Sequence, residues 1–175
     1  MNIYINTIQG NEANARPDGN DTTSYFGVID LVATYQLTPR WLLSLWAMQG
    51  SLKGEFQGGA YTNEMIHWSG VNLYASYKFS DVFSLGTRLE YFDNLSGARA
   101  LLTNGQGTDV QTYTLTGNVY LADGKLNLKP EVRLDNFKKM AGPNGEVLPQ
   151  QFQDAKGNFN TNQQTTVGMA VIYKF

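Results

Sequence analysis

The chain has 175 residues, a length that supports one domain and excludes a multidomain enzyme. Only 16% of the residues are charged and the net charge is −2, so no strong field is available to attract nucleic acid. The absence of cysteine and the presence of a single histidine, His67, exclude a disulfide scaffold, a thiolate metal site and a multi-histidine site, and we expect no metal and no cofactor.

Apolar and polar residues alternate along most of the chain, which is typical of β-strands with two chemically different faces. In chain order the alternation predicts eight strands, at residues 2–9, 22–37, 41–53, 66–79, 82–94, 109–121, 125–138 and 162–175. The pattern is least regular in the third segment, where Trp46 and Met48 fall on the face opposite to Leu43 and Leu45. It is clearest in the fourth segment, around Leu73.

The connections between these segments alternate between short and long. Short turns are predicted at residues 38–40, 80–81 and 122–124, and long polar connections at residues 10–21, 54–65, 95–108 and 139–161. Outer-membrane barrels have this arrangement, with short turns at one end and long loops at the other. We therefore predict that residues 1–175 form a single all-β domain, an antiparallel up-and-down transmembrane β-barrel of about eight strands or part of a larger porin barrel.

Two features leave the local structure open. Pro130 interrupts the seventh segment and removes one ladder donor, so we expect a bulge or weak pairing there. The connection at residues 139–161 is the longest, and it either folds inward as a constriction or stays outside as a surface loop.

Apolar and polar residues alternate along the strands of both soluble and membrane barrels, but a soluble barrel buries its apolar face and a membrane barrel exposes it to lipid. Belts of aromatic residues distinguish the two, because they are typical of membrane barrels. One aromatic group lies beside the short turns, at Tyr35, Trp41, Tyr77, Phe79, Phe83, Tyr120, Tyr173 and Phe175. A second group lies at the loop ends of the strands, at Tyr25, Phe26, Trp68, Tyr91, Phe92, Tyr113 and Phe137. Their separation of roughly eight to ten residues corresponds to about 20–25 Å of tilted strand, the height of an outer-membrane apolar band. We therefore expect the apolar face to contact lipid.

The C-terminal strand ends on an alternating series in which Tyr173 and Phe175 are the last two members. A terminal aromatic on an amphipathic last strand resembles the recognition signal of the bacterial outer-membrane assembly machinery. We therefore expect this machinery, outer-membrane lipids and lipopolysaccharide as partners, and we leave a homo-oligomer or larger complex open.

Four segments carry a more specific resemblance: DLVATY at 30–35, RLEYFD at 88–93 followed by Gly97, LKPEVRLD at 128–135, and QTTVGMAVIYKF at 164–175. In this order they resemble segments of the OmpL-like β-barrel porins of Gram-negative bacteria, and the resemblance spans nearly the whole chain. It implies a location in the bacterial outer membrane, a porin activity, and a match to the C-terminal half of longer family members.

The face opposite to the inferred lipid contact carries nine charged residues: Asp30, Lys78, Arg88, Glu90, Lys129, Glu131, Arg133, Asp135 and Lys174. In one interpretation they line the pore of a porin that passes small hydrophilic solutes or ions by passive diffusion. In the other they form ion pairs that fill a closed eight-strand barrel with a structural or surface-interaction role, because such an interior is just wide enough to be filled by side chains.

A third hypothesis is an outer-membrane hydrolase of the lipid-A-modifying kind, with His67 as base and Ser69 as nucleophile. Side chains two residues apart on one strand lie about 6.6 Å apart, beyond hydrogen-bond reach. We therefore expect no catalytic residues and no enzymatic activity.

Overall fold

The structure is a computed structural model, and it describes residues 1–11, 24–55, 61–94, 97, 107–141, 144–146 and 148–175. Its strands are β1 (Asn2–Gly10), β2 (Tyr25–Gln36), β3 (Trp41–Gly54), β4 (Thr62–Lys78), β5 (Phe83–Asp93), β6 (Val110–Leu121), β7 (Leu126–Phe137) and β8 (Gln163–Tyr173). All eight predicted strands are confirmed. The largest difference is at β4, which begins four residues earlier than expected. Its additional first residues follow a shift in the register with β3 between Leu52 and Gly54, after which Gly54 pairs with Thr62. Residues 22–23, expected in the second strand, lie outside the described residues.

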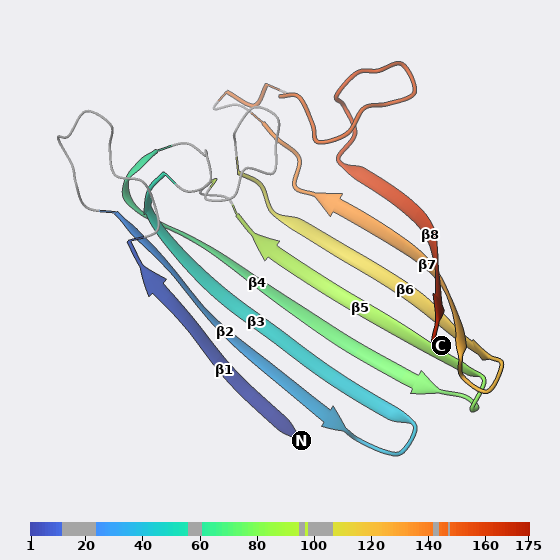
Figure 1. Cartoon of the computed structure of the whole chain (residues 1–175). Coiled ribbons are helices and arrows are strands. Elements are labelled where there is room, and N and C mark those ends of the chain that lie inside the picture. The colour runs from blue at the N-terminus through green and yellow to red at the C-terminus, as the bar shows by residue number, and fades with distance from the viewer. Residues whose placement is uncertain (12–23, 56–60, 95–96, 98–106, 142–143, 147) are drawn as a thin grey trace.

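The strands form one antiparallel sheet in which every strand pairs with its neighbours in the sequence. Figure 1 shows the short turns and both chain ends at one end of the sheet and the long connections at the other. The sheet is open, because within the described residues β1 and β8 each pair on one side only. Among the same residues, no helix is long and apolar enough to cross a membrane.

The short turns are formed by local hydrogen bonds. The Thr38 hydroxyl accepts from the backbone N–H groups of Arg40 and Trp41, at 3.2 and 3.0 Å. Between β6 and β7, Ala122 and Asp123 both adopt positive φ angles, of 50° and 54°. Gly124 follows with a φ of 81°, and its N–H donates to the Leu121 carbonyl at 3.1 Å, so the four-residue connection between the paired Leu121 and Leu126 forms a left-handed turn.

Pairing between β6 and β7 is interrupted at Pro130, as predicted. The register is continuous from Val110 to Thr116 and resumes at Val119, with no ladder pairs between. Gly117 lies in this gap, where an added Cβ would lie 3.2 Å from the Pro130 ring. A proline lacks the N–H that the ladder needs, so the local weakness follows from the residue itself.

The two faces of the sheet differ in both chemistry and burial. On the apolar face, Leu73, Leu89, Leu115 and Val132, on the consecutive strands β4 to β7, are 41–50% exposed. On the polar face, the side chains of Thr112 and Asp135 are only 3% and 7% exposed. A soluble sheet buries its apolar face, so the distribution here is reversed, as in the wall of a membrane barrel.

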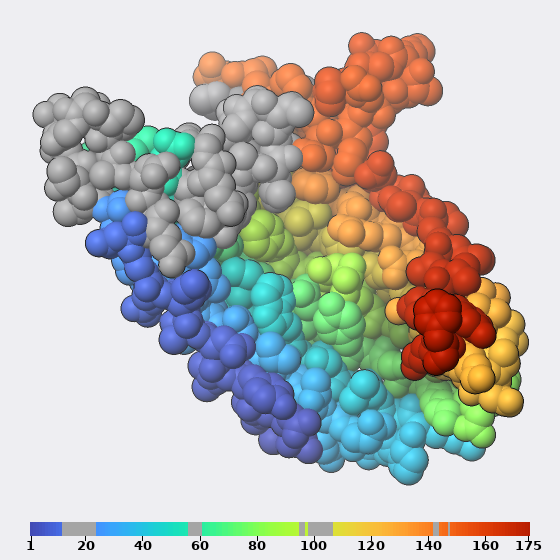
Figure 2. All heavy atoms as spheres, viewed as in Figure 1, coloured from blue at the N-terminus to red at the C-terminus, as the bar shows by residue number. Residues whose placement is uncertain are grey.

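The sheet curls around its polar face. A hollow of about 490 Å³ on this face is lined by residues from Thr34 on β2 to Lys129 on β7. In a flat sheet these strands would be about 24 Å apart, five interstrand spacings, so the polar face is the concave one. Figures 1 and 2 show the same curl, because the C-terminal end of β8 stands in front of the middle strands.

The prediction of an aromatic belt at the loop end is partly wrong. Strand register places Phe26, Trp68, Phe92 and Phe137 on the polar face, and Tyr120 of the turn-side group lies there too, opposite Asn127. The grouping followed distance along the chain, whereas successive side chains of a strand point to opposite faces. Tyr91 and Tyr113 remain on the apolar face at the loop end.

The inward aromatics form a small apolar cluster instead. Phe26, Leu52 and Trp68 are buried together, with Met48 and Phe92 packed against them. The Phe26 and Trp68 ring centroids lie 5.9 Å apart. The indole of Trp68 covers Gly50, its cross-strand partner, so closely that no Cβ would fit there.

At the turn end the apolar-face belt is continuous. Trp41 packs on Tyr77 with ring centroids 4.7 Å apart, Tyr77 on Phe79 at 4.7 Å, and Phe79 on Phe83 at 5.5 Å. These rings lie side by side across the ends of β3, β4 and β5. Aromatic side chains favour a membrane–water interface, and this row provides one boundary of the apolar band.

Candidate pore-lining face

Strand register places eight of the nine charged residues expected on one face there: Asp30, Lys78, Arg88, Glu90, Lys129, Glu131, Arg133 and Asp135. The ninth, Lys174, directly follows the last residue of β8 and lines a hollow at the turn end together with Lys78. Antiparallel pairing sets directly opposed residues on the same side of the sheet. Six of the nine, from Arg88 to Asp135 in the chain, lie on β5 and β7, so most of the charge is on one part of the curved wall.

On β5, Arg88 and Glu90 form an ion pair, with Nε and Oε2 2.7 Å apart. Arg88 also donates to the Thr114 hydroxyl on β6, at 3.4 Å, and its guanidinium lies 5.9 Å from the centre of the Tyr74 ring on β4. The Arg88 side chain therefore contacts both neighbouring strands.

On β7, Asp135 accepts from the Thr112 hydroxyl at 2.7 Å and forms an ion pair with Arg133 at 2.8 Å. Four residues earlier in the chain, on the same face, Glu131 accepts from the Thr116 hydroxyl at 2.7 Å. These threonines lie on β6, between the two charged strands. Each buried carboxylate therefore has a hydrogen-bond donor, which offsets the cost of its partial burial.

The wall formed by β1 to β4 is different. Here Asp30 contacts Asn6, whose side-chain amide donates to the carboxylate at 2.9 Å. Around it, the same face carries Trp46 and Met48 on β3 and the apolar cluster beside Trp68. The polar face thus joins a charged, hydroxyl-rich part to a part that is mostly uncharged and aromatic.

The proposed hydrolase pair is not assembled. His67 Nδ1 lies 2.9 Å from the hydroxyl oxygen of Ser51 on β3, its direct cross-strand partner. Ser69 is instead opposite Gln49 and Asp93. His67 therefore contacts a serine that the sequence pattern could not identify, because cross-strand neighbours depend on register.

The described part of the longest connection is held together by polar contacts. Gln150 accepts from the Met140 N–H at 3.0 Å and donates to two backbone carbonyls, and the Phe152 ring packs edge-on against Phe137 at 5.4 Å. Figure 1 shows this part extending past the strand ends, away from the middle of the sheet. It therefore does not cross the hollow of the polar face, and the outside position is the one observed; residues 142–143 and 147 lie outside the described part.

Asp154 organises the tip of this connection. Its carboxylate accepts from the backbone N–H groups of Asn158 and Lys156, at 2.9 and 2.8 Å, and from the Asn160 amide at 2.8 Å. These hydrogen bonds, the one from Asn158 above all, lower the pKa of Asp154. The carboxylate form therefore stabilises the tip.

An up-and-down antiparallel sheet with an exposed apolar face and a buried polar one is typical of the wall of a transmembrane β-barrel, and this sheet is such a wall with both edges open. Within this class, the model of the family described as "Putative beta-barrel porin-2, OmpL-like" matches residues 1–175, and the chain belongs to this family. The resemblance predicted from the sequence is thus confirmed, and the family is one of porins and not of enzymes. Comparison with curated proteins and with solved structures returned no match.

Proposed function

We propose that this chain forms part of the wall of an outer-membrane porin that passes small hydrophilic solutes or ions by passive diffusion. The observation that carries the proposal is the reversed burial of the sheet, with half-exposed leucines such as Leu73 on one face and buried Thr112 and Asp135 on the other. In water the apolar face would be an aggregation surface. In a bilayer it meets lipid tails, and the polar face meets water inside the barrel.

The charged face supports a water-filled lumen over a sealed one. Its ion pairs on β5 and β7 run along single strands, Arg88 with Glu90 and Arg133 with Asp135, and among the described residues Lys129 and Glu131 form no ion pair across the hollow. Ion pairs that seal a narrow barrel would join opposite walls. We therefore assign the nine charges to the lining of a pore.

The two open edges favour a barrel larger than these eight strands. A strand edge exposed to lipid leaves backbone N–H and C=O groups unsatisfied, each at a cost of several kcal/mol. Both edges continue the alternation of the sheet, with Ile3 and Ile5 on the apolar side of β1 and Val167 and Met169 on that of β8. In this proposal further strands pair with β1 and β8 and complete the wall.

Assembly into the outer membrane would use the C-terminal strand. Phe175 is fully exposed and packs edge-on against Tyr173, with ring centroids 5.5 Å apart. An exposed aromatic end on an edge strand, which pairs with β7 on one side only, is accessible to an assembly machinery. Lipid and lipopolysaccharide would contact the apolar face, which is exposed along its length.

Conductance in planar bilayers tests the proposal. We expect discrete open steps from the folded, unmodified protein. In a salt gradient, Glu131→Gln, which removes a negative charge from the polar face, should shift the reversal potential toward anion selectivity. Glu146→Gln, in the longest connection, makes the same change of charge away from the lining and should leave the potential unchanged. Protein that inserts into the bilayer without any open steps would contradict a pore.

A further inference from the structure

Positive charge collects at the turn end of the polar face. The residues at this end are five cations, Arg40, Lys78, Lys125, Lys129 and Lys174, and two carboxylates, Asp81 and Asp123. At the other end the sign is reversed, since the described residues of the ranges 10–25, 53–65, 93–109 and 138–162 contain six acidic and four basic residues. The described part of the sheet and its connections therefore carries an axial asymmetry of charge, positive toward the turns.

Most of this positive charge is not neutralised locally. Lys78 pairs with Asp81 at 2.6 Å, and the hydrogen bond from Lys78 lowers the pKa of the Asp81 carboxyl. Among the described residues, Arg40, Lys125, Lys129 and Lys174 make no ion pair with a carboxylate.

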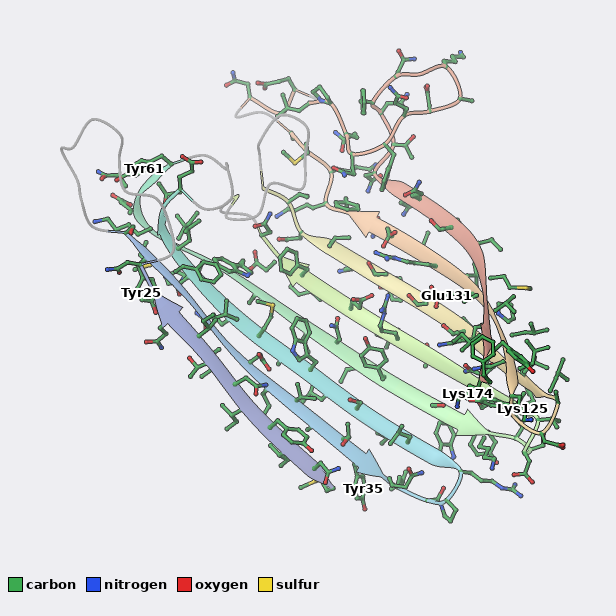
Figure 3. All side chains as sticks on the ribbon, in the orientation of Figure 1. Tyr25, Tyr35, Tyr61, Lys125, Glu131 and Lys174 are labelled. Carbon is green, nitrogen blue, oxygen red and sulfur yellow. The ribbon has the colours of Figure 1, made fainter. Side chains whose placement is uncertain are left out.

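Two of these lysines are held next to each other. The backbone N–H of Lys174 donates to the carbonyl of Lys125 at 2.8 Å, and Figure 3 shows both residues at the turn end of β7 and β8. Like charges directly opposed on neighbouring strands are destabilising. An arrangement of this kind is relieved by a bound anion.

The same end contains a hollow of about 920 Å³. Arg40, Lys78 and Lys174 line it from three parts of the sheet, and its wall also carries the hydroxyl-bearing Ser84 and Tyr120. Two carboxylates, Asp81 and Asp123, line it as well, and Asp81 is paired with Lys78, so positive charge remains in excess. The curl of β8 brings Lys174 to the hollow from the edge of the sheet farthest from β2 and β3. Charged and neutral donors thus converge on one space that is open to water.

We propose that this turn-side hollow binds compact oxyanions that carry two or more negative charges, at the mouth of the pore. Lysine and arginine donate short, charge-assisted hydrogen bonds to oxyanions, and a concave wall with an excess of one sign raises the local concentration of the opposite ion. The role at the pore mouth rests on the proposed function, whereas the binding itself depends only on the fold.

Binding is measured with inorganic pyrophosphate as the probe, by calorimetric titration of the full chain in a non-ionic detergent at low ionic strength. We expect saturable binding to the unmodified protein. The double substitution Lys125→Gln with Lys174→Gln should weaken it about tenfold or more, since the loss of one charged contact of roughly 1.4 kcal/mol is tenfold in affinity. Arg40→Gln, in a surface turn, gives a second variant should the double variant not fold.

The matched control is Lys139→Gln with Lys156→Gln, which removes the same charge at the loop end and should bind pyrophosphate as the unmodified protein does. Absence of saturable binding, or equal weakening in the control and the turn-side variants, would overturn the proposal. Conductance separates the two claims: pyrophosphate binding without open steps rejects the pore and keeps the anion site, and open steps without binding do the reverse.

Discussion

Single residues on β4 show how the two faces divide the chemistry. Leu73 lies on the apolar face, is 50% exposed, and pairs with Leu45 and Leu89 on the neighbouring strands. Ser76, three residues further, lies on the polar face beside Leu42 and Gly86. The pair therefore reports on the two environments within one strand.

We expect Leu73→Arg to lower the free energy of unfolding in bilayers by about 2–4 kcal/mol, which is the cost of an arginine near the midplane of an outer-membrane barrel. Ser76→Arg should be milder because its side chain enters a water-accessible hollow. Folding into lipid vesicles, followed by tryptophan fluorescence against urea, measures both. A larger loss for Ser76→Arg than for Leu73→Arg would reverse the assignment of faces.

Ala122 is strained in the turn between β6 and β7. Its φ of 50° lies in the left-handed region, which costs a residue with a Cβ roughly 1–2 kcal/mol. Ala122→Gly should therefore raise the free energy of unfolding by up to about 1 kcal/mol, after the added backbone freedom of glycine in the unfolded chain is counted. Gly124→Ala, at a φ of 81° in the same turn, should act in the opposite direction. Urea unfolding of both variants is the measurement, and destabilisation by Ala122→Gly would contradict the turn geometry.

At the scale of elements, the apolar cluster around Trp68 ties β2, β3 and β4 together at the loop end. A side chain at Gly50 would overlap the indole, so Gly50→Val should cost about 1–3 kcal/mol through overpacking. Gly168, on the same face of β8, has nothing within 4 Å of an added Cβ. Gly168→Val is therefore the control, and its unfolding midpoint should barely move. Equal effects of the two valines would show that Trp68 is not held over Gly50.

The tip of the longest connection should depend on pH. Because the folded pKa of Asp154 is lowered by its backbone hydrogen bonds, the stabilisation is present above the unfolded pKa and is lost as pH falls through the folded one. We expect the amide protons of Lys156 and Asn158 to lose protection from exchange as the solution is acidified below the ordinary range of an aspartate. Asp154→Asn should remove this pH dependence, and a dependence that survives the substitution would assign it elsewhere.

At the scale of the whole molecule, the period of two was enough to predict the strands, the short turns and the common face of the eight charges that lie within the strand ladders. The belts were predicted less well because neighbours such as Tyr91 and Phe92 were placed together, although one faces outward and the other inward. Contacts between strands, such as His67 with Ser51 and Thr112 with Asp135, depend on register, which alternation does not determine. The open edges could not be predicted either. The edge strands β1 and β8 alternate in the same way as strands that are paired on both sides.

The central claim is that the apolar face meets lipid and the polar face meets water. Because the chain has no cysteine, a single cysteine carrying a nitroxide can be placed in turn at each position from 71 to 78 of β4. In lipid bilayers we expect collisions with oxygen, which concentrates in lipid, to dominate at 71, 73, 75 and 77, and collisions with a water-soluble nickel chelate to dominate at 72, 74, 76 and 78. Equal access of the nickel chelate to both sets, or protection of Leu73 from oxygen and nickel alike, would contradict the account.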